Sequence, residues 1–262
     1  MIYQPLLDDI VEGKCLPVIG AGFSKNVTLS DGRKMPDWTE LANGIGEVLK
    51  TPKTEPMEIL QEYEDKFGRN RLIQAIEKVI PVNGVILGEV HKYFVRISSF
   101  DLIYTTNFDL LLEKAFEQEN KRNCKPLVGE KQLAMYASPP TVNIVKMHGD
   151  LRHQEYLLIT KNDYIEYMTR YAAIATHLSA SLITRTPLYI GYSLTDPNFR
   201  QIRDIIQNRL GEFTRRGYIV LFDPTQQEIE DYSKLHLSVI ELKLEGRTHS
   251  EVLLEFLKEI CD

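Results

Sequence analysis

Short apolar runs alternate along this chain with amphipathic stretches in which apolar positions recur at helical spacing. Each run is four to six residues long, and most runs are followed by loop residues and then by a helix start. Runs of this length predict buried strands, and their alternation with helices predicts a parallel sheet. The predicted strands are residues 15–20, 102–105, 142–147, 156–159, 187–191, 218–222 and 237–242. The pattern therefore predicts an α/β fold with a doubly wound, mostly parallel sheet.

Capping residues mark the starts of several predicted helices. A polar side chain before a helix accepts a hydrogen bond from a free N–H of the first turn, and an acidic residue three positions later completes a capping box. The signals are Asp37 with Glu40, Thr160 with Asp163, Asp196 with Pro197, Pro224, and Thr248 with Glu251. They predict helices to about residues 49, 185 and 210 after the first three signals, and two more near the carboxyl end. A first helix is predicted over residues 3–12.

The segment between the first two predicted strands is too long for an ordinary crossover. Its periodicity is helical from residue 37 to residue 94, with breaks at Pro52, Pro56 and Pro81. Connections in compact α/β units are usually much shorter than this. We therefore expect residues 1–262 to form one Rossmann-like domain, with residues 37–94 as an inserted helical subdomain.

Composition fits a globular chain with a full core. Of the 262 residues, 43% are hydrophobic and 26% are charged, which is ordinary for such a protein. The formal net charge of −6 argues against direct nucleic-acid binding, because phosphate backbones are bound by clustered Lys and Arg. An anionic cofactor is still compatible with this charge, since backbone amides can hold it.

The cysteines and the N-terminal residues indicate which cellular compartment to expect. Cys15, Cys124 and Cys261 lie far apart without a Cys-x-x-Cys pair, so we expect a reducing compartment and no metal site. The first residues lack the basic and apolar regions of a signal peptide, and no run approaches eighteen apolar residues. The expectation is a cytoplasmic protein without membrane contact.

A glycine-rich turn follows the first predicted strand. Gly20 and Gly22 are separated by one residue and followed by Ser24, which is typical of a strand that turns into a phosphate-binding loop. Such a turn can equally be only a tight connection, and the third glycine of the usual dinucleotide motif is absent. Its meaning depends on which residues follow the other strands.

Polar side chains follow four other predicted strands. They are Asn107 and Asp109, His148, Ser193 with Asp196, and Asp223. Because parallel strands end at the same edge of a sheet, these residues predict a nucleotide site with chemistry attached. Each also has a structural interpretation. Asn107, Asp109, Ser193 and Asp196 can cap helices, His148 can be a buried turn histidine, and Trp38 can simply join its helix to the core.

These motifs together resemble one protein family. The segments at residues 20–24, 35–38, 105–109, 148–149 and 191–193 occur in the order and spacing of the sirtuin superfamily. They are most similar to its bacterial sirtuin-like NAD-hydrolase branch, which acts in antiphage defence. The resemblance runs from about residue 14 to about residue 223.

The resemblance implies a role for each matching residue. Asn107 would hold the nicotinamide ribose and a water at the reacting carbon, and His148 would face the ribose hydroxyls as general base. The residues implied to bind NAD are Gly20, Ala21, Gly22, Phe23 and Ser24 in the phosphate loop, Asp37 and Trp38 in a flexible cover, Thr106 and Asp109 beside the reacting group, and Gly191, Ser193 and Asp223 on the adenosine side.

Three departures separate this chain from the sirtuin deacylases. It lacks the two Cys-x-x-Cys pairs of their structural zinc, it has Thr106 where they carry Gln, and its helical insertion precedes Asn107. These departures weaken a protein-deacylase interpretation and leave cleavage of the nicotinamide–ribose bond intact. A neutral imidazole can take a proton from water or a ribose hydroxyl at neutral pH without a metal.

The sequence thus predicts an NAD glycohydrolase that uses NAD as a substrate. One alternative is a non-catalytic module that binds NAD or ADP-ribose, and another is an NAD-dependent protein deacylase. Because a free NAD hydrolase would be toxic, we expect regulation through homo-oligomerisation or a separate activating partner. The resemblance suggests a DNA-translocating ATPase or a phage-sensing protein in that role.

Overall fold

Seven strands form one parallel sheet in the computed structural model, which describes residues 4–80, 85–119, 122–194 and 196–261. The strands are β1 (Cys15–Ile19), β4 (Leu102–Thr105), β5 (Cys124–Leu127), β6 (Val142–Lys146), β7 (Thr186–Ile190), β8 (Gly217–Phe222) and β9 (Leu237–Leu242). Their order across the sheet is β5-β6-β4-β1-β7-β8-β9, and every neighbouring pair is parallel. The predicted α/β fold class is confirmed.

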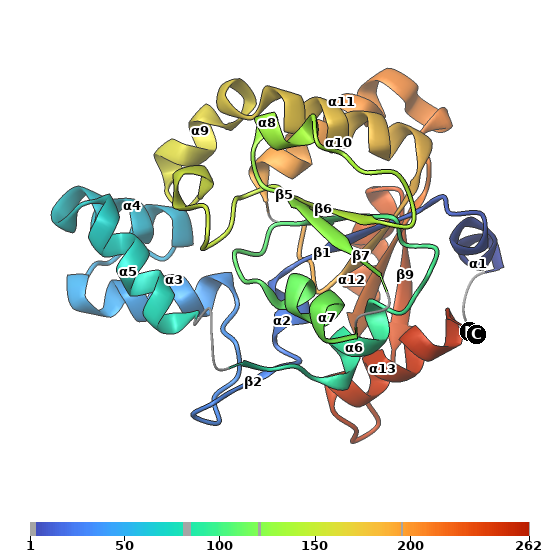
Figure 1. Cartoon of the computed structure of the whole chain (residues 1–262), viewed down its shortest axis with the longest axis horizontal. Helices are drawn as coiled ribbons and strands as arrows, with labels where there is room; N and C mark the ends of the chain where they lie inside the picture. Colours follow the sequence, from blue (N-terminus) through green and yellow to red (C-terminus); the bar gives the residue numbers. More distant parts are fainter. Residues whose placement is uncertain (1–3, 81–84, 120–121, 195, 262) are drawn as a thin grey trace.

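Helices cover both faces of this sheet (Figure 1). One face carries α1 (Gln4–Val11), α6 (Glu89–Phe94), α7 (Leu111–Glu119) and α13 (His249–Glu259). The other carries α8 (Glu130–Leu133), α9 (Lys161–Arg170), α10 (Ala172–Thr184), α11 (Pro197–Leu210) and α12 (Gln226–Lys234). None of the helices in the described ranges is long and apolar enough to cross a bilayer.

The central strand β1 shows how the two cores form. Successive side chains of a strand point to opposite faces. Cys15 and Ile19 accordingly lie in the core under α6, α7 and α13, whereas Leu16 and Val18 lie in the core under α9–α11. All four are fully buried, which explains why the strand is apolar throughout instead of alternating.

The chain reverses direction across the sheet beside β1. From β1 it moves to β4 and β6 on one side, and it then returns to β7 on the other side of β1. The loops after β1 and β7 therefore lie next to each other at the carboxyl ends of the strands. In open α/β sheets this switch point is where ligands bind.

One predicted strand is wrong. Residues 156–159 do not pair in the sheet, because the 3₁₀ helix η2 (Gln154–Tyr156) leads into an irregular buried segment. In this segment the N–H of Leu158 donates to the carbonyl of His148 at 3.0 Å. A short apolar run predicts a strand, but burial in an irregular segment requires the same apolar residues as burial in a sheet. Here it supports the turn that carries His148.

The edge strand β5 was not predicted. Its sequence contains Lys125 and Pro126, and its side chains are only partly buried until Leu127. Proline cannot donate to a strand ladder and is tolerated at sheet edges. A short, half-exposed edge strand with a proline therefore lacks the apolar signal that marks the inner strands.

Between β1 and α6, the described residues form four further helical elements. They are α2 (Ala21–Ser24), α3 (Trp38–Gly46) with the 3₁₀ turn η1 (Glu47–Leu49), α4 (Pro56–Phe67) and α5 (Arg69–Val79). A small antiparallel pair, β2 (Thr28–Leu29) with β3 (Val85–Ile86), connects the two ends of this stretch. Pro81, one predicted break, lies outside the described residues.

Helices α3, α4 and α5 lie together beside the sheet and approach α9 (Figure 1). Arg69 of α5 connects these three helices to α9. Its Nη1 is 2.7 Å from the carboxylate of Asp163 in α9, and its Nη2 donates to the carbonyl of Leu157 at 2.6 Å. Lys161 and Glu58 form a second bridge at 2.8 Å. Whether residues 37–94 behave as a separate inserted subdomain stays a prediction.

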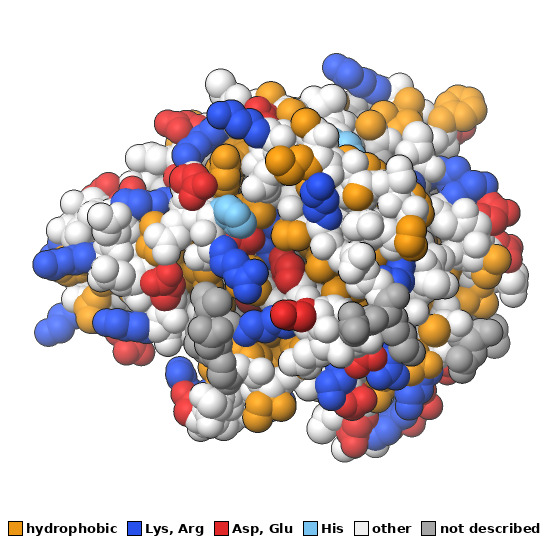
Figure 2. All heavy atoms as spheres, in the orientation of Figure 1, with side chains coloured by type: hydrophobic (Ala, Val, Ile, Leu, Met, Phe, Trp, Pro, Cys, Tyr) orange, Lys and Arg blue, Asp and Glu red, His pale blue; other side chains and the backbone are white. Residues whose placement is uncertain are grey.

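Charged side chains are mixed on the face of the molecule that Figure 2 shows. Lys and Arg groups alternate there with Asp and Glu groups over the same elements. A nucleic-acid-binding face is typically a stripe or patch of one positive sign. On the visible face, positive and negative side chains are instead intermixed.

Candidate active site

The loops after β1 and β7 are in direct backbone contact. The N–H of Gly20 donates to the carbonyl of Ile190 at 3.1 Å, and the N–H of Gly22 donates to the carbonyl of Gly191 at 2.9 Å. A Cβ on Gly20 would lie 2.4 Å from the Gly191 oxygen, and one on Gly191 would lie 2.1 Å from the nitrogen of Phe23. Glycine is required here because no side-chain carbon fits between the two loops.

This contact changes the interpretation of the glycine loop. The N–H groups of Gly20 and Gly22 donate to the β7 loop, and that of Phe23 donates to the carbonyl of Gly20 at 3.0 Å. In this conformation those three amides are used within the protein. The ring of Phe23 is buried in the core, 4.5 Å from the ring of His91, so a ligand contact by Phe23 would have to come from its backbone.

His91 is a structural residue behind this loop. It is fully buried, and neither ring nitrogen has a hydrogen-bond partner among the described residues. Burial lowers the pKa of His91 to about 4, although the Asp109 carboxylate opposes this. His91 is therefore neutral at physiological pH and packs as an aromatic ring.

Four sequence-predicted residues meet in one hydrogen-bond network. The side-chain amide of Asn107 donates to the carbonyl of Gly20 at 3.1 Å and to Ser24 Oγ at 2.9 Å. Ser24 Oγ in turn donates to Asp109 Oδ2 at 2.7 Å. The network joins the loop after β4 to the loop after β1, so the orientation of Asn107 depends on both.

The sequence left open whether Asn107 and Asp109 cap a helix, and the structure shows this role for Asp109 alone of the two. Asp109 does act as a cap, because its Oδ1 accepts the N–H of Leu111 at 3.1 Å at the start of α7. Asn107 does not, since its amide points to the glycine loop. The neighbouring residue Thr106 is half-buried and donates its N–H to the carbonyl of Ile19 at 3.4 Å.

Under this network lies a buried ion pair that the sequence analysis missed. Lys146 Nζ is 3.1 Å from the Glu113 carboxylate and donates to the carbonyl of Asp109 at 2.5 Å. Lys146 is 1% exposed, a burial that a lysine reaches only when it is paired. Its one visible signal in the sequence is a lysine at the end of a mostly apolar strand.

His148 lies at the carboxyl end of β6 in a tight turn. Gly149, which follows it, has a φ of +76° and would collide with the backbone of Tyr156 if it carried a Cβ. The imidazole is buried: its Nδ1 lies 3.3 Å from the hydroxyl of Tyr164, and its Nε2 lies 2.8 Å from Asp196 Oδ2. The second contact has the distance of an ion pair without the alignment of a full hydrogen bond.

Asp196 is thus more than the helix cap that the sequence predicted. It is the N-cap of α11, with Oδ1 accepting the N–H of Phe199 at 2.7 Å. Burial alone would raise the pKa of Asp196, but His148 and the first amides of α11 favour the carboxylate and lower it overall. Burial, and next the Asp196 charge, raise the pKa of Tyr164 well above its ordinary value, so this hydroxyl keeps its proton.

The predicted cover segment reaches the same site. Asp37 caps α3 in a capping box with Glu40, as predicted, and Lys25 Nζ lies 2.6 Å and 3.0 Å from these two carboxylates. The ring of Trp38 packs edge-on against Phe108 at 5.8 Å, and Phe108 in turn lies 6.5 Å from the ring of His148. Lys25 and Phe108 were not singled out from the sequence.

Two predicted adenosine-side residues are exposed. Ser193 lies in the loop after β7, where Asp196 and not Ser193 caps the next helix. Asp223 follows β8, the second strand from β1, and its carboxylate accepts the N–H of Leu244 at 3.2 Å. The geometry gives Asp223 a turn-holding role and leaves a ribose contact as a prediction.

Removing Asn107 offers a first test of the network. For the NAD cleavage that the sequence predicts, we expect Asn107→Ala to lower the rate by about 10²- to 10³-fold, because it removes a fixed dipole from the predicted reacting centre. Asn143→Ala serves as a control, since the Asn143 side chain lies near the amino end of β6 and bonds to the backbone of Ala137 and to Tyr136. Turnover is measured by chromatography of released nicotinamide. Full activity in Asn107→Ala would contradict the prediction.

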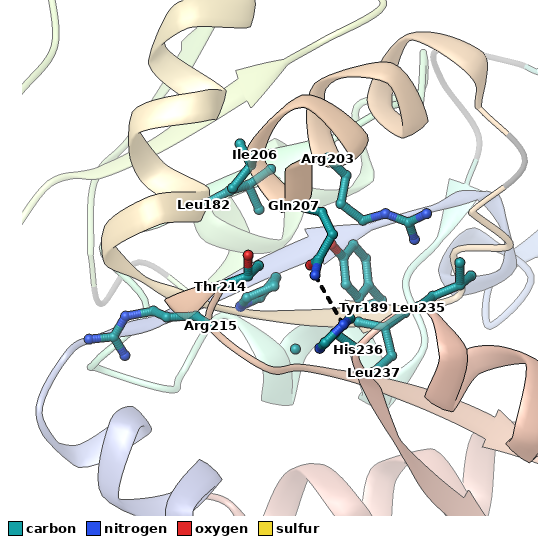
Figure 3. Close-up of a pocket in the computed structure, with 12 residues that line it drawn as sticks. Leu182, Tyr189, Arg203, Ile206, Gln207, Thr214, Arg215, Leu235, His236 and Leu237 are labelled. Carbon is teal, nitrogen blue, oxygen red and sulfur yellow. Dashed lines mark hydrogen bonds between the residues drawn. The ribbon is translucent and has the colours of Figure 1, made fainter. Parts of the chain in front are cut away.

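A small pocket lies at the opposite end of the sheet from these polar residues (Figure 3). It lies at the amino ends of β7, β8 and β9, where Gln207 Nε2 and His236 Nε2 are 3.0 Å apart. Its volume is about 30 Å³, which is room for only about two water molecules. This pocket is too small for a dinucleotide. The polar residues at the carboxyl ends of the strands, which we call the polar cluster, are Ser24, Asn107, Asp109, His148 and Asp196.

The described residues contain no group of three or more His, Cys, Asp or Glu side chains placed to hold a metal ion. The polar cluster consists instead of an amide, an imidazole, a hydroxyl and two carboxylates. Such groups can orient water, accept a proton and stabilise positive charge.

Comparison with known proteins places the chain in a family. It is 31% identical over 217 residues to NAD(+) hydrolase ThsA of Bacillus cereus (strain MSX-D12), covering 81% of this chain and 44% of that protein. It is 30% identical over 190 residues to NAD(+) hydrolase ThsA of Acinetobacter baumannii (strain 532279), covering 70% and 38%. Defense-associated sirtuin 2 of Bacillus subtilis is 25% identical over 228 residues, covering 83% and 22%.

The chain thus spans less than half the length of these relatives. The family model described as SIR2-like domain matches residues 101–240, which include Asn107, His148 and Asp196. This range covers more than half of the 262 residues. The chain belongs to the SIR2-like domain family, and its resemblance to the sirtuin superfamily is confirmed.

Proposed function

We propose that this SIR2-like chain is an NAD⁺ glycohydrolase that cleaves the nicotinamide–ribose bond to give nicotinamide and ADP-ribose. The observation that carries the proposal is the pairing of two groups at adjacent strand ends. Asn107 follows β4 and its amide donates to the glycine loop after β1, and the buried His148 imidazole follows β6 beside a carboxylate. The names of its relatives as NAD(+) hydrolases support the same activity.

The chemistry needs few groups. The bond to the cationic nicotinamide breaks through an oxocarbenium-like state, the nicotinamide leaves with the electron pair of the bond, and water adds to the ribose carbon. Asn107 would orient the ribose and the water, and His148 would take the proton. The Ser24–Asp109 pair places partial negative charge beside Asn107, where positive charge develops on the sugar.

The segment around Trp38 would close this site. Its ring contacts Phe108, which contacts His148, so an apolar path joins the cover to the base. Excluding water strengthens each dipole that faces the cation. We propose that the segment of Asp37 and Trp38 acts as this cover, within an inserted helical subdomain of residues 37–94. We propose that the remaining NAD-binding assignments hold as the resemblance implies, with the amides of Gly20, Gly22 and Phe23 kept in their internal hydrogen bonds.

Turnover of NAD⁺ by the purified chain tests the proposal. We expect nicotinamide and ADP-ribose in equal amounts, measured by chromatography over a range of protein concentrations, with oligomeric mass measured in parallel. Saturable NAD⁺ binding without product would instead support a non-catalytic binding module. Nicotinamide release only with an acylated peptide would support a deacylase.

We also propose that the activity serves antiphage defence in the cytoplasm and is regulated. One relative is named a defence-associated sirtuin, which supports this role. Activity that rises steeply with oligomeric mass would favour control by homo-oligomerisation. Activity that appears only with added cell extract from phage-infected bacteria would favour a separate activating partner.

A further inference from the structure

The two oxygens of Asp196 have different partners. Oδ1 accepts the N–H of Phe199 and caps α11, and Oδ2 faces Nε2 of His148 at 2.8 Å. The side chains of His148 and Asp196 are only 4% and 7% exposed. One carboxylate therefore connects the start of a helix to the ring of the candidate base.

Capping alone does not explain a carboxylate at this position. Asn and Ser cap helices about as well as Asp, and they do so without a charge. Burying an ionised carboxylate is costly unless a charged or hydrogen-bonding partner compensates for it. Among the described residues, Oδ2 lies 2.8 Å from Nε2 of His148, and the same charge also acts on the hydroxyl of Tyr164, so it is directed at the His148–Tyr164 pair.

The surroundings of the ring define where its proton lies. The carboxylate beside Nε2 favours a proton on that nitrogen. On the other side, the protonated hydroxyl of Tyr164 can donate to Nδ1 at 3.3 Å. The neutral ring then carries its hydrogen on Nε2 and its basic lone pair on Nδ1.

We propose that Asp196 is a positioning residue that holds His148 in the Nε2–H tautomer and directs its basic Nδ1 toward Tyr164. The inference rests on the proposed function, in which His148 is the general base. The Tyr164 hydrogen bond is long, so a water or a ribose hydroxyl can replace it.

In the reaction, the proton of the attacking water passes to Nδ1 while its oxygen bonds to the ribose carbon. The bond to nicotinamide breaks and its electron pair leaves with nicotinamide. The imidazolium that forms is stabilised by the Asp196 carboxylate, as in other acid–imidazole pairs. The proton is then released to solvent, so the reaction is balanced without another reactant.

The variant Asp196→Asn separates this role from capping, because Asn retains the size and the capping oxygen. We expect its melting temperature and NAD⁺ affinity to stay close to those of the wild type. Its kcat should fall at least about 10-fold, since Asn can stabilise either tautomer and carries no charge. As a control, Thr248→Ala removes the cap of the distant helix α13 and should lower stability without lowering kcat.

A second measurement reads the tautomer directly. Nitrogen NMR of ¹⁵N-histidine-labelled protein, with the His148 signals assigned by their loss in His148→Gln, should show Nε2–H in the wild type. In Asp196→Asn the two tautomers should become mixed. This readout does not depend on NAD⁺ cleavage.

The outcomes distinguish the two proposals. A wild type that shows the Nε2–H tautomer but never cleaves NAD⁺ would contradict the proposed function and leave the positioning of His148 standing. A wild type that cleaves NAD⁺ but carries the Nδ1–H tautomer would overturn the inference. Full or increased kcat in Asp196→Asn would overturn it as well, and an increase would identify Asp196 as an inhibitory contact.

Discussion

Replacing His148 with Gln should reduce NAD⁺ cleavage by about 10²- to 10⁴-fold, the usual contribution of a positioned general base. Glutamine fills most of the imidazole volume and its amide can still donate to Asp196. It cannot accept a proton at neutral pH. We therefore expect kcat to collapse while NAD⁺ affinity, measured by calorimetry with the intact dinucleotide, survives.

The alanine variant gives a second view of the same residue. His148→Ala should lose the same activity, and it should also be less stable, because Asp196 would be left buried without its partner. Comparing the two variants separates the loss of the base from the loss of packing. Both are assayed for released nicotinamide and for thermal unfolding.

His153 offers a matched control five residues away. It also pairs with a carboxylate, with Nδ1 2.9 Å from Asp150 Oδ1, but its side chain is 36% exposed. We expect His153→Gln to keep nearly full activity. If His148→Gln cleaves NAD⁺ as fast as His153→Gln does, His148 is not the base.

The second large effect is on stability. We expect Gly191→Ala to lower the free energy of unfolding by about 3 kcal/mol or more, because it combines two costs. Gly191 has a φ of +62°, which is unfavourable for any side chain, and a Cβ there would lie 2.1 Å from the backbone nitrogen of Phe23. The β1 and β7 loops must separate to accommodate it.

Gly211 is the control for the cost of the positive φ alone, without a steric clash. Its φ is +53°, but a Cβ at this position meets no atom within 4 Å. Gly211→Ala should therefore cost about 2 kcal/mol, the backbone strain of a positive φ combined with a ψ of −123°, with no steric clash added to it. Chemical denaturation of both variants measures the difference. Equal destabilisation would show that the contact between the two loops is unimportant.

Gly191→Ala should also impair the site, because the glycine loop is held by Asn107. Separating the loops would shift the carbonyl of Gly20, to which the Asn107 amide donates at 3.1 Å. We expect cleavage to fall even at temperatures where the variant stays folded. Gly211→Ala, at the far end of α11, should leave the rate unchanged.

Much of the fold was predictable because its signals are local. An inner strand such as β1 is buried on both faces and is therefore apolar along its whole length. The capping boxes at Asp37, Thr160 and Thr248 form as predicted, since a cap depends on residues three positions apart. Local signals also misled, as in the unpaired segment 156–159 and the half-exposed strand β5.

The candidate site was predictable in part. Strand topology places Asn107 and His148 at neighbouring strand ends, because β4 pairs with β6. The second role of Asp196 was not predictable, since it arises when α11 starts beside the β6 turn. The buried Lys146–Glu113 pair likewise joins a strand to a helix that only folding brings together.

The sequence by itself determined the strand–loop–helix alternation, the helix caps, the glycine turn and the family of this protein. These follow from hydrophobic periodicity and from the conformational preferences of residues close together in the chain. Tertiary structure decided which groups meet: that the glycines of two loops touch, that Ser24 joins Asn107 to Asp109, and that a capping carboxylate faces His148. Such contacts depend on distances across the sheet, and no local pattern encodes them.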